Sequence, residues 1–137
     1  SRSDTHIRTL LNEPAISRSL SGKGFDIVVP GKMTVEAQID AFRSADCVVG
    51  AHGAGLANIM FCEPGTRVIE LFPEYTVSPH FWMLASHFGL DYGAVFGTSF
   101  DQDAALSDQR GSWEAPFLIN EVALVKALGE SRRNYAV

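Results

Sequence analysis

The sequence has few cysteines and an excess of acidic over basic side chains. Its 137 residues include 11 Lys and Arg, 16 Asp and Glu, and two cysteines, and the formal net charge is −5. A chain of this charge offers no basic surface to nucleic acid, so we expect no nucleic-acid partner. Cys47 and Cys62 do not form a CxxC pair, so we expect two small buried thiols, a reducing compartment, and neither a disulfide nor a cysteine metal site.

Long apolar runs are also absent. No stretch approaches the roughly 20 apolar residues that a membrane-spanning helix needs, and the first residues, SRSDTHIR, do not form the apolar part of a secretory signal. We therefore expect no direct membrane span and a cytoplasmic location, with peripheral attachment to the inner membrane possible in a longer protein. The composition, 46% hydrophobic and 20% charged, predicts one globular domain over residues 1–137.

Helical and strand patterns alternate along the chain, separated by glycine and proline. Helices are predicted over 13–20, 35–44, 79–88 and 121–128, with a short helix from Leu56, and strands over 25–29, 47–50, 67–72 and 92–96. Residues 97–115 lack a period and are predicted to form a long surface loop. Trp82, on the third helix, is predicted to pack in the core. The alternation indicates the α/β class: a Rossmann-like parallel sheet with helices on both faces and right-handed crossovers.

The segment GAHGAG, residues 50–55, follows the second predicted strand. Its glycines would let an anion approach the backbone amides of Gly53, Ala54 and Gly55, at the positive end of the short helix. His52 lies inside this loop as a candidate hydrogen-bond donor. The alternatives are a tight structural turn and a structural histidine bonded to a carbonyl.

An acidic residue, Glu70, lies near the end of the next predicted strand. Ligands of open α/β sheets bind at the carboxyl ends of the strands, where a carboxylate accepts hydrogen bonds from ribose hydroxyls. Glu70 and the glycine loop together predict a nucleotide site. The alternatives for Glu70 are pairing with Arg67 or capping nearby backbone. Asn58, on the first turn of the short helix, is predicted to bond the loop or the ligand, and Tyr75 to pack on a base.

A longer run containing these residues resembles a known family. The run GAHGAGLANIMFCEPGTRVIELFP, with the upstream Ser1-Arg2, Arg8, Leu11-Asn12-Glu13 and Gly24-Phe25, resembles the carboxy-terminal region of glycosyltransferase family 61 over about residues 1–96. Members of that family are similar to two-domain GT-B enzymes, in which two Rossmann-like halves face each other. The resemblance implies that this chain is the carboxy-terminal, donor-binding half, and that an N-terminal domain of the same enzyme is its partner.

The resemblance also implies a reaction. A glycosyl group would pass, with inversion, from a nucleotide sugar, UDP-linked, to a glycan acceptor, in capsular or exopolysaccharide biosynthesis. His52 would be the catalytic residue, and the donor would be bound by Arg2, Arg8, Gly53, Ala54, Gly55, Asn58 and Glu70. Arg2 and Arg8 would neutralise the leaving diphosphate, with an ordinary surface arginine as the alternative for each; Arg2 would follow a strand that such folds have before the first helix.

No metal is expected in the reaction that the resemblance implies. Asp101-Gln102-Asp103 imitates the DxD spacing of metal-dependent transferases, but it lies in the predicted loop. Two other functions remain open. Gly53 and Gly55, followed by Glu70, imitate the fingerprint of a NAD-dependent dehydrogenase, although Asn58 stands at the third glycine position. A non-catalytic nucleotide-sugar-binding module is the other alternative.

Overall fold

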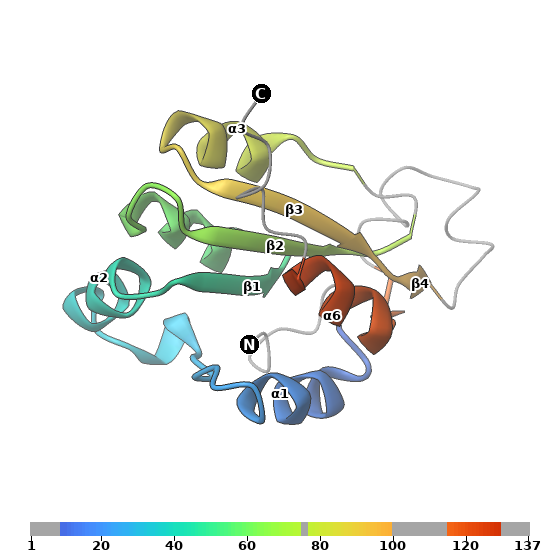
Figure 1. Cartoon of the computed structure of the whole chain (residues 1–137). Helices are drawn as coiled ribbons and strands as arrows, with labels where there is room; N and C mark the ends of the chain where they lie inside the picture. Colours follow the sequence, from blue (N-terminus) through green and yellow to red (C-terminus); the bar gives the residue numbers. More distant parts are fainter. Residues whose placement is uncertain (1–8, 75–76, 100–114, 130–137) are drawn as a thin grey trace.

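A three-stranded parallel sheet lies at the centre of the computed structural model, which describes residues 9–74, 77–99 and 115–129 (Figure 1). Its strands β1 (Cys47–Ala51), β2 (Arg67–Phe72) and β3 (Asp91–Phe96) lie in the order β1-β2-β3. The register pairs Cys47 with Arg67, and Arg67 with Asp91. The strand predictions for these segments are confirmed to within one residue at each end.

Helices α1 (Glu13–Ser21) and α6 (Glu121–Gly129) cover one face of the sheet. Ile16 and Leu20 lie four residues apart on α1, so both side chains face the sheet. They share a hydrophobic cluster with Ile69, Leu71, Val95 and Leu124. Asn120 caps α6 as predicted, because its Oδ1 accepts a hydrogen bond from Ala123 N–H at 3.1 Å.

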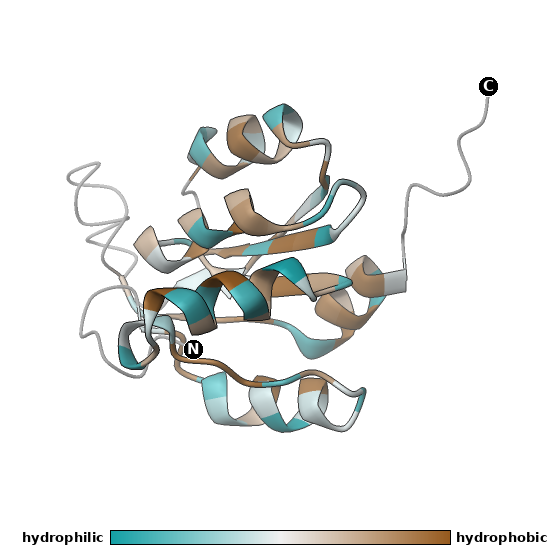
Figure 2. Cartoon of the chain, turned by 90° about the vertical axis from the view of Figure 1, so that its left-hand side faces the viewer, coloured by the Kyte–Doolittle hydropathy of each residue, from teal (hydrophilic) through white to brown (hydrophobic). Residues whose placement is uncertain are grey.

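Helices α2 (Val35–Arg43), η2 (Ala54–Phe61) and α3 (His80–His87) cover the other face. Thr34 caps α2 by accepting a hydrogen bond from Ala37 N–H at 3.2 Å. The second hydrophobic cluster includes Phe42, Leu56, Ile59, Val68 and Ala85. The helices carry alternating hydrophilic and hydrophobic stretches (Figure 2), as expected of elements with one buried face. The α/β class, the parallel sheet and the helices on both faces are therefore confirmed.

The predicted strand over residues 25–29 is wrong. This segment has no regular structure and leads into a 3-10 turn, η1 (Pro30–Lys32). A strand needs a hydrogen-bonding neighbour, and β1 has β2 as its only partner in the described sheet. Val29 has extended backbone angles, but the described residues supply no partner strand for this segment.

Three further expectations need correction. The helix expected from Leu56 starts at Ala54 and is a 3-10 helix. Trp82 is 53% exposed and does not belong to the core. The loop expected over 97–115 contains β4 (Thr98–Ser99), which pairs antiparallel with β5 (Phe117–Leu118) just beyond it. Residues 100–114, which include Asp101 and Asp103, lie outside the described residues.

Candidate functional site

The glycine loop lies at the carboxyl end of β1, next to the carboxyl end of β2. His52 N–H donates to the Leu71 carbonyl at 2.9 Å, which fixes the start of the loop to the central strand. The first bond of η2 runs from Leu56 N–H to the Gly53 carbonyl at 2.9 Å. Within the described part of the chain, the amides of Gly53, Ala54 and Gly55 have no backbone acceptor. These amides form the donor-rich N-terminus of a helix, where an anion is stabilised.

The glycines of the loop do not all have the same structural role. A Cβ on Gly50 would lie 2.9 Å from Leu56 Cδ1, so packing of η2 on the sheet accounts for this glycine. A Cβ on Gly55 would meet only Pro30, at 3.8 Å. Gly53 is extended, and Gly55 is not among the glycines of positive φ. A strained turn therefore does not explain Gly53 and Gly55, and the exposed surface at Ala54 and Gly55 remains open to a ligand.

A buried carboxylate connects the loop to the sheet. Glu70 has no exposed surface and lies on β2 opposite Gly50. Its Oε1 contacts His52 Nδ1, and its Oε2 accepts a hydrogen bond from the Tyr92 hydroxyl at 2.5 Å. Burying a carboxylate is costly unless such partners are present. Strand alternation explains the arrangement, since Glu70 and Tyr92 point to the same face as Val68, towards η2 and α3.

Aromatic rings fix the plane of the His52 imidazole. Phe72 stacks on it at a centroid distance of 5.2 Å, and Phe81 of α3 meets it edge-on at 5.4 Å. His52 is buried, with 7% of its surface exposed. The carboxylate of Glu70 selects the form of His52 that carries a proton on Nδ1.

Tyr92 acts as a permanent donor to this group. Burial raises its pKa above the ordinary value, and the hydrogen bond to Glu70 and the charge of that carboxylate raise it further. The phenol therefore stays protonated over the whole neutral range. Glu70 keeps two donors as long as the fold is intact.

The structure gives Glu70 a different role from the ribose acceptor predicted from the sequence. Its side chain is fully buried and both oxygens have protein partners, so it presents no surface to a ribose hydroxyl. The alternative pairing with Arg67 is also wrong. Arg67 instead forms an ion pair with Asp91 at 2.8 Å and donates to the Ala127 carbonyl at 2.9 Å. Glu70 therefore orients His52.

The other predicted site residues separate into two groups. Asn58 Nδ2 donates to Gln38 Oε1 at 2.8 Å, which ties η2 to α2 and supports the loop without a ligand. Arg2, Arg8 and Tyr75 lie outside the described residues. Sequence reasoning brought His52, Glu70 and the loop together correctly, and the structure does so through a direct contact.

Tyr92, Phe72 and Phe81 were missed as parts of the site. The sequence does contain a signal for Tyr92. A third parallel strand beside β2 must place one of its alternating side chains next to Glu70. No local pattern predicts that Phe81 of α3 reaches His52, since that contact depends on how the helix packs.

The described residues contain neither a cluster of metal-binding side chains nor a helix that could span a membrane. No three or more His, Cys, Asp or Glu side chains among them gather in a way that could hold a metal ion. Cys62 is a buried thiol, whereas Cys47, also expected to be buried, is half-buried. None of the described helices has the length and apolar character needed to cross a membrane.

Comparison with known proteins identifies the family. Residues 1–69 match the family model for glycosyltransferase 61. The chain therefore belongs to the glycosyltransferase 61 family. The resemblance noted in the sequence is confirmed, and the dehydrogenase alternative is not favoured.

Curated relatives carry transferase names. A β-1,2-xylosyltransferase of Arabidopsis thaliana is 36% identical over 63 residues, which are 46% of this chain and 12% of that protein. The β-1,2-xylosyltransferase RCN11 of Oryza sativa subsp. japonica is 35% identical over the same shares of the two chains. The xylan glycosyltransferase MUCI21 of Arabidopsis thaliana is 31% identical over 96 residues, 66% of this chain and 19% of that protein. The chain thus spans less than a fifth of the length of these relatives.

Proposed function

We propose that this chain is the nucleotide-sugar-binding domain of a glycosyltransferase. It would be the carboxy-terminal, Rossmann-like half of a GT-B enzyme that transfers a sugar, with inversion, from a UDP-linked donor to a hydroxyl of a glycan. One observation carries the proposal: the backbone amides of Gly53–Gly55 stand beside His52 at the carboxyl ends of β1 and β2. That edge of a parallel sheet is where α/β proteins bind nucleotides.

The loop supplies the electrostatic part of the proposed mechanism. Negative charge grows on the diphosphate as its bond to the sugar breaks, and preorganised donors lower the energy of that state. The amides of Gly53, Ala54 and Gly55 donate to the diphosphate oxygens. When its ring carries a proton on both nitrogens, His52 donates from Nε2, either to the diphosphate or to the donor sugar, and Arg2 and Arg8 add positive charge. No metal takes part in this proposal.

Glu70 and the aromatic rings hold His52 in place during the reaction. Glu70 accepts from Nδ1, so the imidazole cannot rotate without breaking a buried hydrogen bond. Phe72 and Phe81 restrict the plane of the imidazole ring. A donor whose position is fixed before the ligand binds loses little entropy when it acts.

The donor and acceptor are proposed from the relatives and the family resemblance. The names of the two plant β-1,2-xylosyltransferases make UDP-xylose the first donor to test. The acceptor is a carbohydrate hydroxyl, and capsular or exopolysaccharide biosynthesis in the cytoplasm is the proposed setting. An N-terminal domain of the same enzyme would complete the acceptor side and supply the catalytic base.

Calorimetry of the chain with UDP, UDP-xylose and NAD tests the proposal. We expect UDP and UDP-xylose to bind with a dissociation constant on the order of micromolar to millimolar, and NAD not to bind. His52→Ala should weaken UDP binding about tenfold or more, since a charge-assisted hydrogen bond contributes roughly 1.5–3 kcal/mol. His87→Ala is the matched control, because His87 is exposed on α3 and its ring packs on Phe88.

The proposed site would be refuted if His52→Ala bound UDP as tightly as the unchanged chain does. Binding of NAD in preference to UDP would contradict the transferase function itself. The melting temperature of each variant, measured without ligand, separates loss of a contact from loss of the fold.

A further inference from the structure

Three aromatic rings form a row along the carboxyl edge of the sheet. The imidazole of His52 and the ring of Phe72 stack at a centroid distance of 5.2 Å and an interplanar angle of 20°. Phe72 and Phe96 stack in the same way, at 5.4 Å and 15°. Near-parallel rings whose centroids are this far apart are offset from each other. Each ring therefore covers only part of the next one.

The register of the sheet places these rings side by side. Phe72, the last residue of β2, pairs with Phe96, the last residue of β3. His52 directly follows β1, and its N–H donates to the Leu71 carbonyl. Alternate residues of a strand share a face of the sheet, so Phe72 and Phe96 lie on the same face as Glu70. The row thus begins at the candidate site and crosses the ends of all three parallel strands (Figure 1).

The last ring of the row, Phe96, is exposed, whereas the other two are buried. His52 exposes 7% of its surface and Phe72 only 2%, but Phe96 exposes 51%. A single exposed apolar side chain is ordinary on a protein surface. Phe96 differs because it lies at the edge where parallel sheets bind ligands, and because it continues a row of rings that starts at His52. Its exposed part is a flat apolar surface on which a ring of the ligand can stack.

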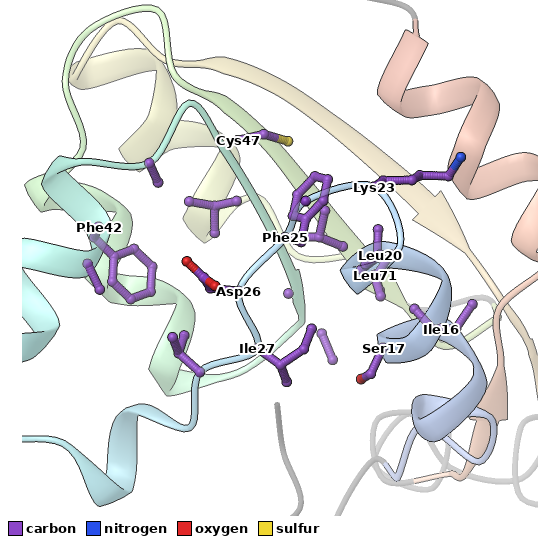
Figure 3. Close-up of a pocket in the computed structure, with 18 of the residues that line it drawn as sticks. Ile16, Ser17, Leu20, Lys23, Phe25, Asp26, Ile27, Phe42, Cys47 and Leu71 are labelled. Carbon is purple, nitrogen blue, oxygen red and sulfur yellow. The ribbon is translucent and has the colours of Figure 1, made fainter.

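The surroundings of β1 differ from this row. A cavity of about 510 Å³ lies beside β1 and is lined by parts of α1 and α2 (Figure 3). Gly50 and Ala51 line it where β1 ends, but none of the three rings of the row does. Its volume is within the range of small-molecule pockets. A ligand held at the glycine loop therefore has a cavity beside β1 and the row of rings over β2 and β3.

We propose that the sugar ring of the nucleotide-sugar donor stacks on Phe96, an inference that rests on the proposed function. A nucleotide sugar carries its nucleoside and its sugar on opposite ends of the diphosphate. With the diphosphate at the amides of Gly53–Gly55, the two parts extend away from the loop in different directions. The nucleoside lies on the side of the cavity, and the sugar lies along the row of rings. His52 then stands between the diphosphate and Phe96, close to the bond that breaks.

The length of the row favours the sugar over the base as the stacked ring. Neighbouring strands lie about 4.7–4.9 Å apart, so the end of β3 lies roughly 10 Å from the end of β1. Stacked rings need about 4.5–7 Å between their centres. The distance that remains fits a sugar ring attached directly to the diphosphate. A base would be further away, because the ribose separates it from the diphosphate.

Stacking on a phenyl ring also suits the chemistry of a sugar. A pyranose has C–H groups on its ring faces and hydroxyls around its rim. One face therefore packs on the apolar ring of Phe96, which removes apolar surface of both partners from water. The hydroxyls at the rim stay in water or bind polar groups, so the contact selects a ring face without requiring a partner for each hydroxyl.

The affinities of Phe96→Leu for UDP and for UDP-xylose test the inference. Leucine keeps an apolar side chain against Phe72 and removes the flat ring. We expect the variant to bind UDP within about twofold of the unchanged chain, and UDP-xylose about three- to tenfold more weakly, the range expected for loss of a stacking contact. Phe96→Tyr keeps a ring and should restore the affinity for UDP-xylose. Phe88→Leu is the matched control, because Phe88 ends α3 close to the start of β3, at the other edge of the sheet.

Chemical shifts of the ligand provide a second measurement. Protons that lie over an aromatic ring move upfield in the NMR spectrum. We expect the ring protons of xylose to move upfield when UDP-xylose binds to the unchanged chain, and to lose this shift with Phe96→Leu. The H5 and H6 protons of uracil should behave alike with the two proteins.

The outcomes separate this inference from the proposed function. If the unchanged chain binds neither UDP nor UDP-xylose, both are wrong. If it binds both ligands and Phe96→Leu binds each of them as tightly, the proposed function stands and stacking on Phe96 is wrong. If Phe96→Leu loses affinity for UDP as much as for UDP-xylose, Phe96 contacts the nucleotide and the assignment of the sugar is wrong. The melting temperature of each variant without ligand shows whether the fold is kept.

Discussion

At the scale of single residues, Glu70 organises the site by being buried. A carboxylate with no exposed surface keeps its partners because losing one leaves a charge in a poorly solvating environment. His52 and Tyr92 are both oriented by this requirement. The hydrogen bonds that hold the site are therefore also hydrogen bonds that hold the fold.

Tyr92→Phe tests this dependence. The change removes the hydroxyl that donates to Glu70 Oε2 at 2.5 Å. We expect a loss of about 1.5–3 kcal/mol in the free energy of unfolding, the usual value for a hydrogen bond to a charged group. Denaturant unfolding of the variant and of the unchanged chain measures the difference.

Glu70→Gln provides the control for that measurement. In this background the acceptor is neutral, so adding Tyr92→Phe should cost clearly less than it does alone. Equal costs in the two backgrounds would contradict a specific hydrogen bond between Tyr92 and the Glu70 carboxylate.

At the scale of elements, the sequence predicted those parts of the fold whose partners lie close along the chain. The helices beginning at Glu13 and Val35, and the strands over β1, β2 and β3, follow from periodicity, and the start of the helix at Val35 also follows from its Thr34 cap. Residues 25–29 have strand composition but are irregular, because a strand also needs a neighbour and composition does not show whether one is present.

The candidate site was also predicted only where the information lies close along the chain. His52 and Glu70 were brought together from the rule that parallel strands end at one edge. The role of Glu70 was mistaken, because whether a carboxylate is exposed or buried depends on the third strand and on α3. Trp82 was mistaken for the same reason, since a short apolar helix has no sequence signal for which face is covered.

Gly97→Ala tests the junction between β3 and β4. A Cβ at Gly97 would lie 2.3 Å from the Leu118 carbonyl oxygen and 2.8 Å from Phe117 Cδ2. The first of these atoms belongs to the backbone of β5 and cannot rotate away, so the strand itself must move. We expect destabilisation of about 1–3 kcal/mol or more, seen as a lower melting temperature.

Gly22→Ala is the matched control for the junction. Its added Cβ would be 3.5 Å from the Arg18 and Ser19 carbonyl oxygens, and its φ of −62° suits alanine. We expect no loss, or a gain of about 0.4–1 kcal/mol from a less flexible unfolded chain. A junction that tolerates Gly97→Ala equally well would show that β5 is not held against Gly97.

At the scale of the whole molecule, burial of the thiols makes stability depend on alkaline pH. Burial raises the pKa of Cys47 from 9.0 to about 11, although the nearby Arg67 guanidinium opposes the rise, and burial raises the pKa of Cys62 to about 11. The folded state therefore favours the neutral thiols more than the unfolded state does. Their contribution to stability is complete below about pH 9 and is lost as the pH rises towards 11.

Denaturant midpoints measured between about pH 8 and pH 11 test the alkaline effect. The Cys47→Ala/Cys62→Ala double variant removes both thiols and should lose less stability over this interval than the unchanged chain. Parallel pH curves for the two proteins would assign the alkaline loss to other groups.

Glu70 occupies the middle of the central strand, between Ile69 and Leu71 on the opposite face. Evolution therefore has little freedom there, because most replacements at this position that change the chemistry also damage the fold. Ala54 and Gly55 are exposed at the rim of the site, so a change of side chain there does not also damage the fold. Under the proposed function, substitutions at this rim should change ligand affinity while leaving the melting temperature nearly unchanged, whereas substitutions of Glu70 should change both.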